Sequence, residues 1–251
     1  MTPVMNPLVT RFLTLDDIPR LLELETRQWK DHQAADAQTL RQRIETYPQL
    51  CIGSFCARSG QALASLFMRP IDQVEIQQAR SWADCAAARP GSAANASANS
   101  LFGISLTSVN PDAASALFDF FWPHALKGGW RDIYLGSPIP GLAKALLVDP
   151  GLDVERYVHS RRAGLPRDAQ LRYYHRKGFK QIVAVVPDYF PHEASMNYGV
   201  LLRGKVPLST SLPVWELMPK SLLQAVLKCL VSVSGLSVGR AKPSALEGAR
   251  S

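Results

Sequence analysis

The segment YYHRKGF at residues 173–179 has the residue types and spacing best suited to chemistry. Gly178 suits the left-handed conformation at the end of a helix, and Phe179 then begins an apolar strand. Tyr174 lies one turn before that glycine, so its hydroxyl can point into a cleft. A phenol has a pKa of about 10 and stays protonated at neutral pH, so it can donate a proton to a forming anion. The residues alone allow either proton donation or simple packing at Tyr174, and Tyr173 is expected in the core.

The elements that position Tyr174 follow from the apolar pattern of residues 1–204. Gly60 supplies the turn of an early hairpin, Pro111 opens the longest helix, and Pro123 should kink or split that helix. The stretch 71–100 loses the pattern and is expected to be a mobile loop. This order fits one α/β (α+β) domain, a mixed sheet with helices on both faces. Strands are expected at 8–13, 50–57, 61–68, 101–109, 131–136, 180–187 and 196–204, and helices at about 14–29, 36–46, 110–126, 153–163 and 168–178.

This order and the YYHRKGF motif resemble the GNAT (GCN5-related N-acetyltransferase) superfamily. Its aromatic-Tyr-x-x-x-Gly-Phe signature ends the penultimate helix. The resemblance covers residues 8 to about 204. It implies a central sheet of about seven, mostly antiparallel strands. The segments IYLGSPIPGLAK (133–144), ERYV (155–158) and VPDYFPHEASMNYGVLL (186–202) also resemble a subgroup of GNAT domains attached to carbon-nitrogen hydrolase domains. No hydrolase domain fits in this chain.

The resemblance implies an N-acyltransferase that moves an acyl group from acetyl-CoA or another acyl-CoA to the amine of a small molecule. Tyr174 would then protonate the leaving thiolate. A backbone amide of the fourth strand, among Leu106, Thr107, Ser108 and Val109, would hold the thioester oxygen. A splay between the fourth and fifth strands would make room for the pantetheine arm.

The place of the family's pyrophosphate loop departs from its Arg/Gln-x-x-Gly-x-Gly/Ala pattern. Residues 109–116 read VNPDAASA and contain neither Arg nor Gly. Ala113, Ala114 and Ser115 are small enough to present backbone amides, but Asp112 adds negative charge where an anion would lie. Weaker coenzyme A binding, another donor and lost activity are the alternatives. The expected donor-binding residues are Leu106, Thr107, Val109, Ala113, Ala114 and Ser115.

The acceptor side is less defined. Ser137 follows the fifth strand beside the expected cleft, and Asp188 and Tyr189 lie in a late loop, so these three are the candidate substrate-binding residues. Strand 101–109 has no Asp or Glu to act as a base. His192 and Glu193 are further candidates in the late loop, and water is the alternative base.

Composition narrows the partners. The net charge is +7 with a pI of about 9.4, which attracts anions, but the Lys and Arg residues are scattered and no nucleic-acid motif occurs. An acidic acyl carrier protein is therefore an alternative donor, and a catalytically inactive binding module is a third hypothesis. The four cysteines form no metal-binding spacing, and Cys51 and Cys56 are expected as buried thiols. With neither a signal peptide nor an 18-residue apolar run, a cytoplasmic location is expected.

Residues 205–251 are expected to form a separate extension. An apolar-faced helix is predicted around 215–230, followed by a disordered tail after Gly239. We expect this helix to pack on the domain; a homodimer contact and a membrane-surface contact are the alternatives.

Overall fold

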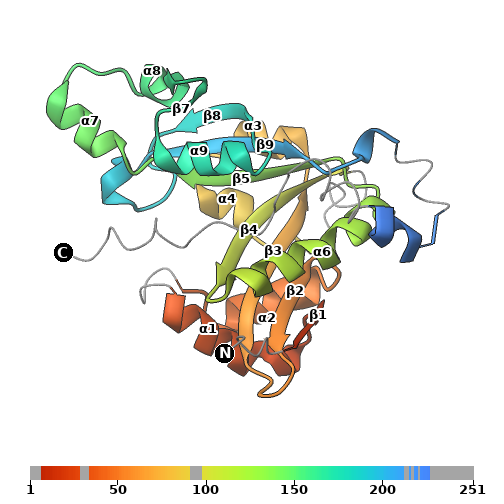
Figure 1. The fold of residues 1–251 in the computed structure, drawn as a ribbon. Coiled ribbons are helices and arrows are strands. Elements are labelled where there is room, and N and C mark those ends of the chain that lie inside the picture. Colours follow the sequence, from red (N-terminus) through yellow and green to blue (C-terminus); the bar gives the residue numbers. More distant parts are fainter. Residues whose placement is uncertain are drawn as a thin grey trace, which may run out of the picture.

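The fold is built on one seven-stranded sheet with the order β1-β2-β3-β4-β5-β9-β8 (Figure 1). The computed structural model describes residues 7–28, 34–90, 98–211, 215, 218–219 and 221–226. Every strand pair of this sheet is antiparallel except β4–β5, which is parallel. The strands are β1 (Leu8–Phe12), β2 (Cys51–Cys56), β3 (Ala62–Ile71), β4 (Ser100–Ser108), β5 (Asp132–Pro138), β8 (Gln181–Val186) and β9 (Gly199–Lys205), with a separate small hairpin of β6 (Arg161–Arg162) and β7 (Leu165–Pro166).

The helices begin at polar caps that the sequence supplies. Asp36 accepts a hydrogen bond from the Thr39 amide at the start of α2, and Asp168 accepts from the Gln170 and Leu171 amides at the start of α9. The helices are α1 (Ile18–Gln28), α2 (Ala37–Thr46), α3 (Gln73–Gln78), α4 (Trp82–Ala86), α6 (Pro111–Lys127), α7 (Leu142–Val148), α8 (Val154–His159) and α9 (Ala169–Arg176).

The register shows which helices share a face of the sheet, because paired residues point to the same side. Phe120 of α6 packs edge-on against Phe12 of β1, and Phe12 is linked through Ile52 and Leu66 to Leu106 of β4. The same face continues through Met68 and Gly103 to Leu135 of β5, which packs against the same apolar cluster as Tyr174 of α9. Therefore α6 and α9 cover one face, and Figure 1 shows them over its two halves.

Two apolar clusters divide the interior. The larger one joins β1–β4 with α1, α2 and α6, and includes Leu24, Phe67 and Leu117. The smaller one lies between β8, β9 and helices α7, α8 and α9, and includes Leu142 and Leu202. The larger cluster therefore crosses the β4–β5 ladder, where it includes Ile133 of β5 and Leu201 of β9, whereas the smaller one stays on the β5–β9–β8 side.

The expected strands, the Gly60 turn and the Gly178 helix end are confirmed. Gly60 and Gly178 have φ of +70° and +96°, values that favour glycine. Two expectations were wrong. Stretch 71–100 contains α3 and α4, and α6 is one helix that Pro123 does not split. The helix α7 after β5 was not predicted. The helix expected at 153–163 ends at His159, where the β6–β7 hairpin begins.

Other expectations fall partly outside the described residues: Trp29, positions 91–97 of the expected mobile loop, and the chain from 227 onward. Leu223 is fully buried in the larger cluster, against which Trp215 and Met218 also pack, so this part of the extension contacts the domain. Cys51, Cys56 and Cys85 are free and buried. Among the described residues, none of the helices is long and apolar enough to cross a membrane.

Candidate active site

The centre of the sheet opens because β4 and β5 pair over only part of their length. Their ladder runs from Ser100↔Asp132 to Gly103↔Leu135. Beyond these pairs β4 is bonded only to β3, and β5 only to β9. Figure 1 shows the two strands diverging from this ladder. The expected splay is therefore present, at the carboxyl ends of both strands, where ligands commonly bind in open sheets.

A bulge in β4 marks the point where the strands part. Ser105 pairs with Phe67 and Gly103 with Met68, so Ile104 is the extra residue. The Val109 amide donates to the Leu63 carbonyl, which means that alternate amides toward the bulge also face β3. The amides of Leu106 and Ser108 consequently point toward the open side. Leu106 is also 39% exposed, so its surroundings are accessible.

Tyr174 lies on the same face as this open edge of β4. Its ring packs in the smaller cluster and meets Phe179 edge-on, with 6.0 Å between ring centroids. Burial raises the pKa of the Tyr174 phenol to about 12, with a smaller contribution from Tyr173 and an opposing hydrogen bond from Gln170. The phenol is protonated throughout the physiological range, as a proton donor must be. Tyr173, expected in the core, is 38% exposed, so that expectation was wrong.

The N-terminus of α6 is closed by its own cap. The Asn110 side-chain oxygen accepts from the Asp112 and Ala113 amides at 2.8 and 3.0 Å, and the Asn110 carbonyl accepts from the Ala114 amide at 3.1 Å. Pro111 has no amide hydrogen to offer. The amides expected to receive a pyrophosphate therefore already have partners within the chain, and Ala113 is fully buried.

Sequence reasoning missed a buried carboxylate behind β4. Thr107 points away from the Tyr174 face, and its hydroxyl donates to Glu25 of α1 at 2.6 Å. Glu25 also accepts from the Ala35 amide at 3.2 Å, and its charge acts on the buried guanidinium of Arg43. Thr107 therefore ties the free half of β4 to α1 and does not line the Tyr174 side. A local sequence pattern could not indicate this contact, because Glu25 and Thr107 are 82 positions apart in the chain.

The expected acceptor residues do not gather at one accessible place. Ser137 is on the Tyr174 face but fully buried, and its hydroxyl donates to the Pro138 carbonyl. Tyr189 is 1% exposed on the opposite face, where its ring leaves no room for a Cβ at Gly136. Asp188 is exposed in the loop before it. As substrate contacts, Ser137 and Tyr189 disagree with this structure.

The late loop instead supports the segment that follows β5. Ser195 is fully buried, accepts from the Ile139 amide at 2.8 Å and lies 2.7 Å from His192 Nδ1. Burial lowers the pKa of His192, which favours the neutral ring. His192 is therefore placed to hold this loop.

Two cavities lie away from the splay. One of about 500 Å³ is lined by Phe12, Tyr47 and the C-terminal end of α6. The other, of about 510 Å³, lies between α7 and the start of α9. Within the described residues there is no His, Cys, Asp and Glu group that could hold a metal ion.

Comparison with solved structures identifies the architecture. The loading GNATL domain of CurA from Lyngbya majuscula has a TM-score of 0.65 at 17% identity, over 80% of this chain and 98% of that one. A GphF GNAT-like decarboxylase in complex with isobutyryl-CoA has 0.61 at 22%, over 79% and 99%. The chain has the GNAT fold. A malonyl-CoA decarboxylase from Rhodopseudomonas palustris has 0.52 at 13%, over 82% of this chain and 61% of that one. No family model and no curated protein sequence matches.

The splay between β4 and β5 is the one that the resemblance to the GNAT superfamily implied. The fold does not assign a reaction, because the similar structures include decarboxylases and a loading domain. The subgroup suggested by residues 133–202 stays a prediction. The activity depends on the groups that face the splay.

Proposed function

We propose that the protein is an N-acyltransferase that moves an acyl group from a pantetheine thioester to an amine. One observation supports the proposal: the Leu106 amide faces the open side of β4, and Tyr174 packs in the same apolar cluster as Leu135, the last β5 residue of the β4–β5 ladder. One group donates to the carbonyl oxygen and the other to the leaving sulfur. Thioester aminolysis needs donors of these two kinds.

The reaction balances with these groups. The amine nitrogen attacks the thioester carbon, and the oxygen gains negative charge that the Leu106 amide stabilises. The carbon–sulfur bond then breaks, and the Tyr174 phenol donates its proton to the thiolate. The proton that the amine loses passes to water, which restores the phenol. Glu25 acts on the other face through Thr107, where it fixes the free half of β4.

A direct assay tests the proposal. We expect thiol release from acetyl-CoA or acetyl-pantetheine to require an added amine, with the amide product identified by mass spectrometry. Amine-independent thiol release would indicate hydrolysis, and carbon dioxide from malonyl-CoA would indicate a decarboxylase. If no thioester in an acyl panel reacts or raises the melting temperature, the inactive binding module is the better hypothesis.

Two donors remain for the same chemistry, acyl-CoA and an acylated carrier protein. Acyl-CoA is the donor that the fold favours. A carrier protein is favoured by one observation, that Asn110 already occupies the amides of the α6 N-terminus. A pantetheine arm that is attached to a carrier protein needs no binding site for a nucleotide pyrophosphate at the N-terminus of α6.

Substituting Asn110 separates these donors. Asn110→Gly frees the Asp112 and Ala113 amides, and glycine is nearly as good a cap as asparagine. If coenzyme A approaches α6, we expect acetyl-CoA to bind about 2- to 10-fold more tightly to this variant in calorimetry. Asn110→Asp, the matched control, keeps the cap, adds negative charge and should weaken binding. Equal affinities for the three proteins would place the nucleotide away from α6.

A further inference from the structure

The positive charge of the protein is concentrated in one part of the fold. Residues 142–180, which hold α7, α8, the β6–β7 hairpin and α9, contain nine Lys and Arg against four Asp and Glu. One of these acids, Asp168, is buried and accepts from the Tyr157 hydroxyl and three backbone amides. This region therefore carries most of the net charge of +7.

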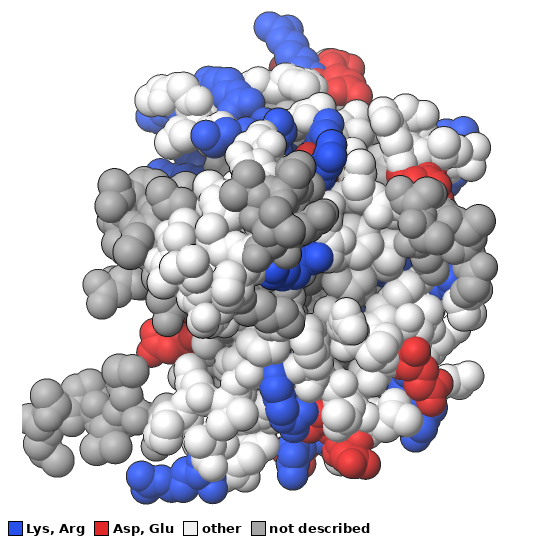
Figure 2. All heavy atoms as spheres, turned by 90° about the vertical axis from the view of Figure 1, so that its right-hand side faces the viewer, with Lys and Arg blue, Asp and Glu red and all other residues white. Residues whose placement is uncertain are grey.

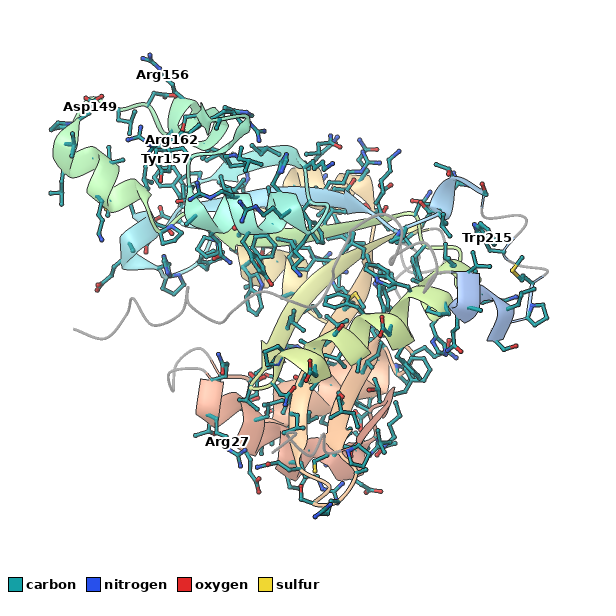
Figure 3. The ribbon with its side chains drawn as sticks, viewed as in Figure 1. Arg27, Asp149, Arg156, Tyr157, Arg162 and Trp215 are labelled. Atoms are coloured by element: carbon teal, nitrogen blue, oxygen red, sulfur yellow. The ribbon has the colours of Figure 1, made fainter. Side chains whose placement is uncertain are left out.

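The cations of this region are exposed and open to a partner. We define the basic surface as the exposed residues Lys144, Arg156, Arg161, Arg162, Arg167, Arg176 and Lys180. No ion pair joins any of the seven to a described acid, whereas Arg11, Arg20, Arg69 and Arg203 elsewhere are paired. Figure 3 shows Arg156 and Arg162 at the same end of the molecule. On the face seen in Figure 2, which is the right-hand side of Figure 1, Lys and Arg are instead scattered among Asp and Glu.

A groove with apolar walls lies within this surface. The cavity of about 510 Å³ is lined by the apolar residues Ala145, Val148 and Leu152, by Lys144 and Arg167, and by two acids, Asp149 and the internally bonded Asp168. Val148 is 87% exposed, so the apolar wall is open to solvent. An acidic helix with an apolar side chain at its centre complements this arrangement, because its carboxylates meet the cations while the apolar group enters the groove.

We propose that the basic surface docks an acidic carrier domain that presents the acyl thioester on its own pantetheine arm. This inference rests on the proposed function, for which it names the donor. Two observations support this donor. The side chain of Asn110 occupies the α6 amides that would bind a phosphate. Helix α9 carries both Tyr174 and part of the basic surface. A partner on α9 delivers its arm beside the acid.

The test compares two double variants that change the net charge equally. Arg156→Glu with Arg162→Glu alters the basic surface. Arg58→Glu with Arg80→Glu alters exposed arginines outside it and is the control. The probe is an acetylated acyl carrier protein, with binding measured by calorimetry. We expect the first variant to lose at least tenfold in affinity, and the control to stay within about twofold of the wild type. Wild-type affinity should fall steeply with added salt.

The remaining measurements distinguish carrier docking from catalysis of acyl transfer. Acetyl-pantetheine lacks both nucleotide and protein, so its turnover should be the same in all three proteins. Carrier binding without turnover of any donor would contradict the proposed function and leave the docking surface in place. Equal loss of affinity in both variants would show that the basic surface is not the docking site. A nucleic-acid duplex that binds the wild type as tightly, with the same loss in the first variant, would also overturn it.

Discussion

Replacing Tyr174 by Phe is expected to lower kcat for acyl transfer from an alkyl thioester by about 100-fold or more, with the fold retained. The substitution removes only the hydroxyl, and the ring still packs on Phe179. Removal of a positioned general acid typically costs between about 10² and 10⁴ in rate. The measurement is single-turnover thiol release from acetyl-pantetheine, with the melting temperature as a check on folding.

The leaving group distinguishes an acid from a packing residue. An aryl thioester expels a stabilised thiolate that needs no proton, so Tyr174→Phe should slow its reaction far less. Tyr173→Phe is the matched control, because it removes the neighbouring hydroxyl from a ring that is 38% exposed. We expect the control to react at nearly the wild-type rate with both donors. An equal loss for alkyl and aryl thioesters would remove Tyr174 from the proton transfer.

Removing the Leu106 amide hydrogen is expected to lower kcat by about 10²- to 10³-fold, as for other single donors to an oxyanion. Replacing Leu106 by its α-hydroxy-acid analogue turns the amide into an ester and keeps the side chain. Because this amide faces away from β3, the change removes no bond of the β3–β4 ladder. KM should change little, since the interaction strengthens as charge develops on the oxygen.

The same ester replacement at Thr107 is the control. The Thr107 amide faces β3, so its loss should lower the free energy of unfolding by about 1 kcal/mol and leave kcat close to the wild-type value. Both proteins are compared by denaturant unfolding and by turnover. A kcat loss as large at Thr107 as at Leu106 would show that strand geometry, and not a specific donor, limits the rate.

Most of the fold could be predicted from the sequence, because strands, turns and helix ends depend on residues that are close together in the chain. The alternation in LFGISLTSV indicated β4, and Gly178 indicated the end of α9 through the left-handed conformation that it adopts. The missed helices α3, α4 and α7 have five to seven residues, so their helical period hardly repeats and could not be recognised in the sequence. The expectation of a split at Pro123 was wrong, because α6 accommodates this proline within its last two turns.

The site was harder to predict, because its parts meet only in the folded chain. Asp112 drew attention as a charge, but the decisive atom at α6 is the side-chain oxygen of Asn110. Which β4 amide points outward depends on the bulge at Ile104, and pairing with β3 sets that bulge. Burial of Ser137 and Tyr189 depends on residues that pack across from other strands and loops.

The parallel ladder between β4 and β5 is short, and the packing around it limits how far the splay can open. Only four residue pairs form the ladder, but the larger apolar cluster crosses it and includes Ile133 of β5 and Leu201 of β9. Swinging one half of the sheet against the other would therefore expose part of that cluster to water as well as break backbone bonds. The splay is thus expected to keep a fixed width, so that it selects donors by the size of the acyl chain.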